Sequence, residues 1–125
     1  MRSILFVGLG GAIGAAGRYL ISLIPVKGAF PFLTFLTNLL GAILIGVIVG
    51  FAASKENASK DLVLFLKTGV CGGFTTFSTF SLESLLLLEN RKYFLGSVYI
   101  MASVALCILG VAIGKYCSTK WLVQL

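Results

Sequence analysis

Apolar residues in this chain occur in long blocks, and polar residues collect in the short segments between them. Four blocks reach the length of about 20 residues that a helix needs to cross a hydrocarbon layer roughly 30 Å thick. The blocks cover residues 3–24, 32–53, 62–88 and 94–116, and the connections are residues 25–31, 54–61 and 89–93. This pattern predicts an all-α membrane protein, in which residues 1–125 form one domain of four transmembrane helices.

The composition supports this prediction. Hydrophobic residues make up 58% of the chain and charged residues 11%, and the mean hydropathy is +1.06. A soluble domain of this size cannot bury so much apolar surface. The first block is too long for a secretory signal and lacks a convincing small-residue cleavage site, so we interpret it as the first span.

The net charge of +6 comes from cations at the span ends, which predicts contact with the lipid bilayer and not with nucleic acid. With four spans, both termini and the second connection share one side, and this side holds the larger share of the cations. They are Arg2, Lys55, Lys60, Lys115 and Lys120, with Lys67 near them, against Lys27, Arg91 and Lys92 on the other side. The bias favours cytoplasmic termini in a bacterial inner or plasma membrane, but it is modest and permits insertion in both orientations.

Catalytic and metal-binding signatures are missing from the sequence. Its three cysteines are scattered and it has no histidine, so neither a disulfide framework nor a familiar zinc site is expected. It has no nucleotide-binding loop and no pair of carboxylates within the spans. We therefore expect neither an enzyme nor a pump.

The third block differs from the others because its middle, residues 72–81, reads GGFTTFSTFS. Gly72 and Gly73 each lower helix stability by about 1 kcal/mol relative to Ala, and the hydroxyls compete for backbone groups. This predicts a third helix broken at its centre, with freed carbonyls that suit a cation and freed N–H groups that suit an anion. Phe77 and Phe80 share a face, where their positive ring edges could attract a small anion or the rings could simply pack in the core.

Isolated polar residues in the other blocks are further candidates. Asn38 needs a partner in hydrocarbon, and its amide serves either as an interhelical bond or as a ligand donor. Tyr99, Ser103 and Cys107 lie four residues apart and share one helix face. Stripes of small residues predict close packing of helices. These stripes are Gly10, Gly14 and Gly17 in the first block, Ala42, Gly46 and Gly50 in the second, and Gly110 and Gly114 in the fourth.

Two charges lie inside the spans. Arg18 precedes Pro25 by seven residues and Glu83 precedes Asn90 by seven, and both span ends lie on the same side, so each charge is at a depth of about 10 Å. Equal depth favours a structural charge pair, direct or through water and hydroxyls, that shapes an aqueous vestibule and supports folding. The alternative is that Arg18 extends to the headgroups.

Three segments together resemble the small Fluc-type (CrcB-like) fluoride channels. They are residues 10–19 (GGAIGAAGRY), residues 38–41 with Gly46, and residues 69–80, which end in TTFSTF. The order, spacing and length match over nearly the whole chain. The resemblance implies a passive, fluoride-selective channel that exports fluoride and works as an antiparallel homodimer with two pores.

The resemblance also implies roles for individual residues. The fluoride pathway would contain Asn38, Phe77, Phe80, Thr79, Ser81, Tyr99 and Ser103. The backbone carbonyls of Gly72 and Thr75 would bind a structural Na+ ion at the dimer axis, where a water molecule is the alternative. Cys107 stands where a hydroxyl is often found in this family and Ile43 where an aromatic is common, so neither receives a role.

Two other classes remain as alternatives. A proton-coupled multidrug transporter can share this length and layout, but it needs an intramembrane carboxylate, and Glu83 in the third block is the only candidate. The glutamate expected in the first block of such a transporter is absent. A non-transporting assembly protein would explain the small-residue stripes but would leave the polar middle of the third block without a purpose.

Overall fold

The structure is a computed structural model that describes residues 1–124, without the side chains of residues 122 and 123. Its four candidate spans confirm the all-helical prediction, and no strand occurs in the described residues. Three spans are continuous helices: α1 (Arg2–Ser22), α2 (Phe32–Ser54) and α6 (Tyr93–Val123). The third is divided into α3 (Lys60–Val63), the π-helix η1 (Leu64–Cys71), α4 (Gly72–Phe74) and α5 (Phe77–Glu89).

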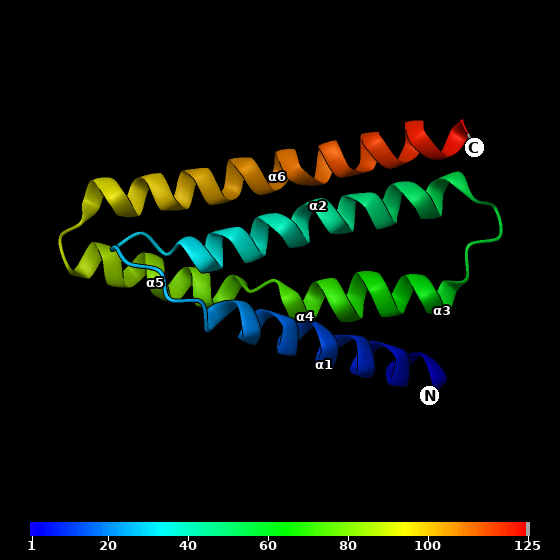
Figure 1. Ribbon diagram of the computed structural model, residues 1–125, viewed down its shortest axis with the longest axis horizontal. Coiled ribbons are helices and arrows are strands. Elements are labelled where there is room, and N and C mark those ends of the chain that lie inside the picture. The colour runs from blue at the N-terminus through cyan, green and yellow to red at the C-terminus, as the bar shows by residue number, and fades with distance from the viewer. Residues whose placement is uncertain (125) are drawn as a thin grey trace.

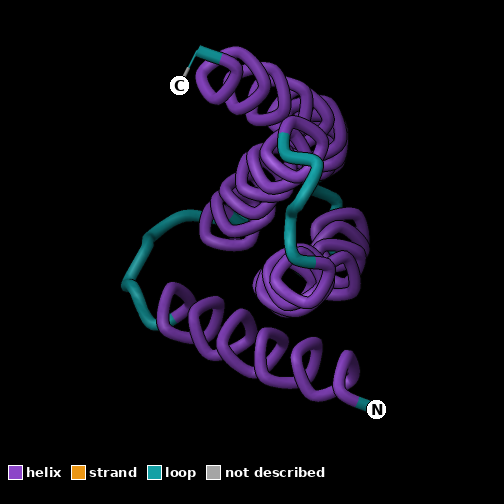
Figure 2. The backbone as a smooth tube through the Cα atoms, turned by 90° about the vertical axis from the view of Figure 1, so that its right-hand side faces the viewer, coloured by secondary structure: helices purple, strands orange, loops and turns teal. Residues whose placement is uncertain are grey.

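The spans lie side by side with both termini at the same end (Figure 1). α6 packs along α2, α2 also contacts η1, and α1 packs on η1 and α4. The end-on view shows α1 at the edge opposite α6, with the third span between α1 and α2 (Figure 2). Both halves of the third span therefore meet other helices, although much of its surface is open.

Glycines let the backbones approach closely at two interfaces, as the small-residue stripes predict. A Cβ on Gly46 would collide with the Val111 carbonyl, and one on Gly114 would collide with the Ile43 carbonyl, so α2 and α6 meet backbone to backbone. The same holds between α1 and the third span at Gly14. The hydrophobic effect does not drive helices together in lipid. Dispersion contacts along these close interfaces stabilise the packing in its place.

The break in the third span is confirmed, but it lies beyond the glycines. Gly72 and Gly73 remain helical, whereas Thr75 and Thr76 are extended. The reason is that Gly73 serves a close approach, since a Cβ there would meet the Gly11 carbonyl of α1. The threonines are drawn out of the helix by side-chain hydrogen bonds, which are part of the site described below.

The apolar core is small and sits between α5 and α6. Phe80, Leu87 and Tyr99 form its buried centre, and partly buried Phe30, Phe35, Leu95 and Ile100 pack against them. Most other large apolar side chains, including those of Leu9 and Ile13, point outward. Such an apolar outer surface is stable against lipid or against another protein chain, and it fits a multi-pass membrane protein.

Candidate functional site

Asn38 of α2 binds both backbone groups of Thr76 at the break. Its Nδ2 donates to the Thr76 carbonyl at 3.1 Å, and the Thr76 N–H donates to its Oδ1 at 2.7 Å. One amide side chain thus replaces the helical partners that Thr76 loses. The interhelical role expected for Asn38 is confirmed, and its second Nδ2 hydrogen remains available as a donor.

Thr76 also begins the next helix. Its Oγ1 accepts from the Thr79 N–H at 3.2 Å and donates to the Thr79 hydroxyl at 2.9 Å, so Thr76 is the N-cap of α5. The N–H groups of Phe77 and Ser78 lie in the first turn, where a helix offers them no carbonyl. The positive end of the α5 dipole therefore lies at the break, in the middle of the third span.

Carbonyl groups are exposed on the other side of the break. The amides that would bind the Gly72 and Thr75 carbonyls in a continuous helix are those of Thr76 and Thr79, and both donate elsewhere. In contrast to these two carbonyls, the Gly73 carbonyl accepts a hydrogen bond, from Arg18 Nε at 3.2 Å. The break thus places free acceptors and free donors within a few residues of each other.

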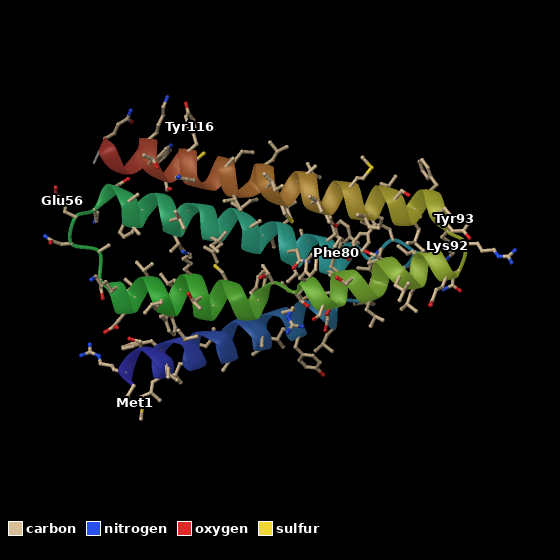
Figure 3. All side chains as sticks on the ribbon, turned by 180° about the vertical axis from the view of Figure 1, so that it is seen from behind. Met1, Glu56, Phe80, Lys92, Tyr93 and Tyr116 are labelled. Atoms are coloured by element: carbon tan, nitrogen blue, oxygen red, sulfur yellow. The ribbon has the colours of Figure 1, made fainter. Side chains whose placement is uncertain are left out.

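The two phenylalanines point in different directions. Their ring centroids are 5.5 Å apart, and the Phe80 ring is also 5.3 Å from that of Tyr99. Phe80 is only 8% exposed, and Figure 3 shows it on the inner side of α5, whereas Phe77 is 78% exposed. Phe80 therefore packs within the chain, and Phe77 projects from it.

A cavity of about 350 Å³ opens at the break between α2, the third span and α6. It brings together most of the residues predicted to bind ions. Its lining includes Asn38, Gly72, Thr75, Phe77, Phe80 and Ser103, together with Thr76, Lys67, Cys71 and Cys107. Ser103 is 5% exposed, and its Oγ has no hydrogen-bond partner among the described residues. A buried hydroxyl without a partner is costly, and Ser103 belongs to the lining of a space that a polar ligand could fill.

Three predicted pathway residues do not line this cavity. Thr79 faces a smaller cavity of about 70 Å³, which it shares with Arg18 and Thr34. Ser81 is exposed and donates to the Phe77 carbonyl at 2.9 Å. Tyr99 is fully buried, with its hydroxyl turned to Glu83.

Glu83 is held by hydroxyl groups. One carboxylate oxygen accepts from Thr34 Oγ1 at 2.8 Å, and the other accepts from Tyr99 Oη at 2.7 Å. The direct pairing of Arg18 with Glu83 is therefore not formed, and Arg2–Asp61 at 3.1 Å is the ion pair found in the described residues. The physical reason is that the two hydroxyls already satisfy the carboxylate, while the guanidinium reaches the Gly73 carbonyl at the break.

α2 contributes to this network through two threonines that were not predicted as site residues. Thr34 binds Glu83, and Thr37 lines the smaller cavity beside Arg18. A signal for them was present, because Thr34, Thr37 and Asn38 are spaced three and four residues apart in an otherwise apolar block. That spacing places the three polar side chains on one helix face.

The larger cavity combines an amide, hydroxyls, a partly positive ring edge and a helix N-terminus. This set of donors suits a small anion or another polar solute. Its lining contains no carboxylate, and the described residues hold no cluster of three His, Cys, Asp or Glu side chains that could bind a metal ion.

Comparison with known proteins gives a consistent match. Residues 5–115 match the family described as "CrcB-like protein, Camphor Resistance (CrcB)". A protein of Ruminiclostridium cellulolyticum named "Fluoride-specific ion channel FluC" is 46% identical over 118 residues, which cover 92% of this chain and 91% of the relative. Relatives of the same name from Rhizobium meliloti (45% identity, 91% and 94% coverage) and Phocaeicola vulgatus (47% identity, 94% and 99% coverage) are similar to it over the same extent. These relatives are named as ion channels and not as enzymes. The chain belongs to the CrcB-like family of membrane proteins.

Proposed function

We propose that this protein is a passive, fluoride-selective ion channel that exports fluoride and so lowers its concentration in the cytoplasm. The observation that carries the proposal is the cavity at the break, which is lined by Asn38, Phe77 and Ser103, the last with a hydroxyl that has no partner among the described residues. The shared name of the curated relatives supports fluoride as the ion.

The lining explains how fluoride can be preferred. Fluoride is small and strongly hydrated, so a pore must offer close donors in place of water, as the Asn38 amide, hydroxyls and backbone N–H groups can. Ring edges of Phe77 and Phe80 add weak attraction without a fixed charge. Because no single donor binds tightly, the ion can also leave.

Export in this mechanism is passive and is driven by the membrane potential. Hydrogen fluoride enters a cell as a neutral molecule from acidic surroundings and dissociates inside. A membrane potential of 100 mV, negative inside, then drives each fluoride ion outward with about 2.3 kcal/mol.

The working unit in this proposal is an antiparallel homodimer. Phe77 projects from the protomer at mid-span, and a Cβ on the exposed Gly72 would meet nothing within 4 Å, so the polar break lies open on one side. Polar backbone cannot face lipid, and a second copy would cover it. The modest difference in charge between the two ends permits both orientations. Tags on the N-terminus should be reached from both sides of the membrane, and a single orientation throughout would exclude this arrangement.

A structural Na+ ion is proposed for the axis of that dimer. The Gly72 and Thr75 carbonyls fit it, because the amides that would bind them in a helix are engaged by Asn38 and Thr76. Two protomers would present four such hard oxygen ligands. The ion would supply positive charge near the pathway. Dialysis against buffer free of sodium and lithium should reduce transport, and activity that is unchanged after verified removal would reject a required ion.

The decisive test uses the purified protein in liposomes. Liposomes loaded with potassium fluoride should release fluoride when valinomycin allows compensating potassium efflux, and liposomes loaded with chloride should not. Equal release of the two anions would refute selectivity. No fluoride release from liposomes with verified protein insertion would refute the function.

A further inference from the structure

Lys67 carries a charge inside the membrane that the proposed function does not yet use. It lies seven residues after Lys60, the start of the third span, at a depth of about 10 Å. Ionisable residues at such depth are expensive and usually face a water-filled space or a partner. The ion pair found in the described residues, Arg2–Asp61, leaves Lys67 without a carboxylate partner there.

Lys67 instead lines the cavity at the break. The cavity wall that contains Asn38, Phe77 and Ser103 also contains Lys67 and Cys107. Lys67 is thus placed on the side of the break toward the chain termini, and its side chain borders the same space as the predicted fluoride ligands.

The π-helix explains this placement. η1 covers Leu64–Cys71, and its wider turn brings residues separated by four and by five positions onto one face. Lys67, Cys71 and Gly72 accordingly line the cavity together. In a regular α-helix, Gly72 would be rotated well away from Lys67. Single-turn π segments are frequent at functional sites, and this one aligns a cation with the break.

No carboxylate in the described lining of this cavity offsets the positive charge of Lys67. Asp61 is bound to Arg2, and Glu83 is bound to Thr34 and Tyr99 away from it. Arg18 lines the other, smaller cavity. Lys67 is thus the one charged side chain in the described lining of the larger cavity.

We propose that Lys67 attracts anions into the pathway and raises the fluoride concentration at the break. This inference rests on the proposed function and names a residue that controls entry on the side nearer the termini. Lys67 acts through its field, as a positioning charge, and not as a direct ligand. A long flexible ammonium group concentrates anions without holding one tightly, which keeps conduction fast.

Fluoride efflux at low fluoride concentration and low ionic strength tests this inference. Lys67→Gln should reduce the rate by about tenfold, the low end of the effect expected for a charge-lined cleft. Lys67→Arg should stay within about twofold of the parent, because the charge is kept. Lys60→Gln is the matched control, since it removes the same charge from the same span outside the cavity, and it should leave the rate unchanged.

Screening provides a second readout. Raising the ionic strength to about 1 M with an impermeant salt, at constant sodium, shortens the Debye length to about 3 Å and should remove most of the advantage of the parent over Lys67→Gln. If the Gln variant does not give the gel-filtration peak of the parent, Lys67→Met replaces it. If neither variant folds, the test is whether raising the ionic strength lowers the fluoride efflux rate of the parent and of Lys67→Arg.

The outcomes separate this inference from the channel function. Parent and Lys67→Gln conducting fluoride equally well would mean that Lys67 extends to the lipid headgroups, and the inference would be wrong while the channel function stood. A rate in Lys67→Arg as low as that in Lys67→Gln, or a parent rate unaffected by screening, would also overturn it. A parent that conducts no fluoride would reject the proposed function itself.

Discussion

The contact between α2 and α6 and the break in the third span are built on opposite principles. Along α2 and α6, glycines such as Gly46 and Gly114 allow the backbones to touch, and the helices are held by close packing. At the break, a few side-chain hydrogen bonds from Asn38 and Arg18 hold backbone groups that the helix has released. The first region is rigid because it is closely packed. The second can present donors and acceptors because it is not a regular helix, and its shape depends on a few polar residues.

The largest effect is expected where the close packing is broken. Gly46→Leu would push a side chain into the Val111 carbonyl and the Lys115 amide of α6, and backbone cannot yield as a side chain can. We expect loss of the folded protein, seen as aggregation by gel filtration in detergent. Gly8→Leu is the control, because a Cβ there meets nothing within 4 Å. A stable Gly46→Leu protein would show that the two helices are free to separate.

The next effect concerns Asn38. Asn38→Leu would leave the Thr76 N–H and carbonyl without their partner and should lower the free energy of unfolding by about 3 kcal/mol, the cost of two unsatisfied buried groups. Asn38→Asp keeps the acceptor but places a negative charge beside a carbonyl and in the anion pathway. It should strongly impair fluoride efflux, and rapid efflux would argue against a direct role for the amide.

The rings should affect transport more than folding. Phe77→Ile and Phe80→Ile keep bulk but remove the positive ring edge, so each should slow fluoride efflux by about tenfold. Phe80→Ile should also lower the unfolding temperature, because Phe80 is buried against Tyr99, whereas the exposed Phe77 should not. Phe94→Ile, at the start of α6, serves as the control. If both variants release fluoride at the parent rate, the two rings have no role in transport and serve only in packing.

A smaller effect distinguishes the partners of Glu83. A double-mutant cycle of Thr34→Val and Glu83→Gln should give a coupling of about 1 kcal/mol in thermal stability, because the two side chains are hydrogen-bonded. The cycle of Arg18→Gln and Glu83→Gln should stay below about 0.5 kcal/mol, because they do not touch within the protomer. Strong coupling in the second cycle would restore a charge pair, through water or across a dimer. Transport abolished by Glu83→Gln in a stable protein would favour the proton-coupled alternative.

The smallest effect is expected at the ion pair near the N-terminus. Arg2 is 80% exposed and Asp61 is 28% exposed, so Arg2→Gln should change stability by less than about 1 kcal/mol at physiological salt. Fluoride efflux should be that of the parent. A large loss would mean that this end of the bundle contributes more to folding than its exposure indicates.

Local sequence patterns were sufficient to predict the features of this protein that depend on residues close together in the chain. The four spans follow from local hydropathy, the packing surfaces from glycines at helical spacing, and the break from hydroxyls that compete for backbone groups. Each of these features is set by a few consecutive residues, so no knowledge of the fold was needed to predict it.

Only the tertiary structure decided which groups meet across helices. Within the predicted stretch of residues 72–81, the break falls at the threonines and not at the two glycines, because Gly11 packs on Gly73 and Asn38 binds Thr76. Arg18 and Glu83 form no direct pair, because each has another partner and equal depth does not fix helix rotation. A contact between them through water or hydroxyls stays a prediction. Rotation and packing are set by contacts between residues far apart in the chain, and no local pattern encodes them.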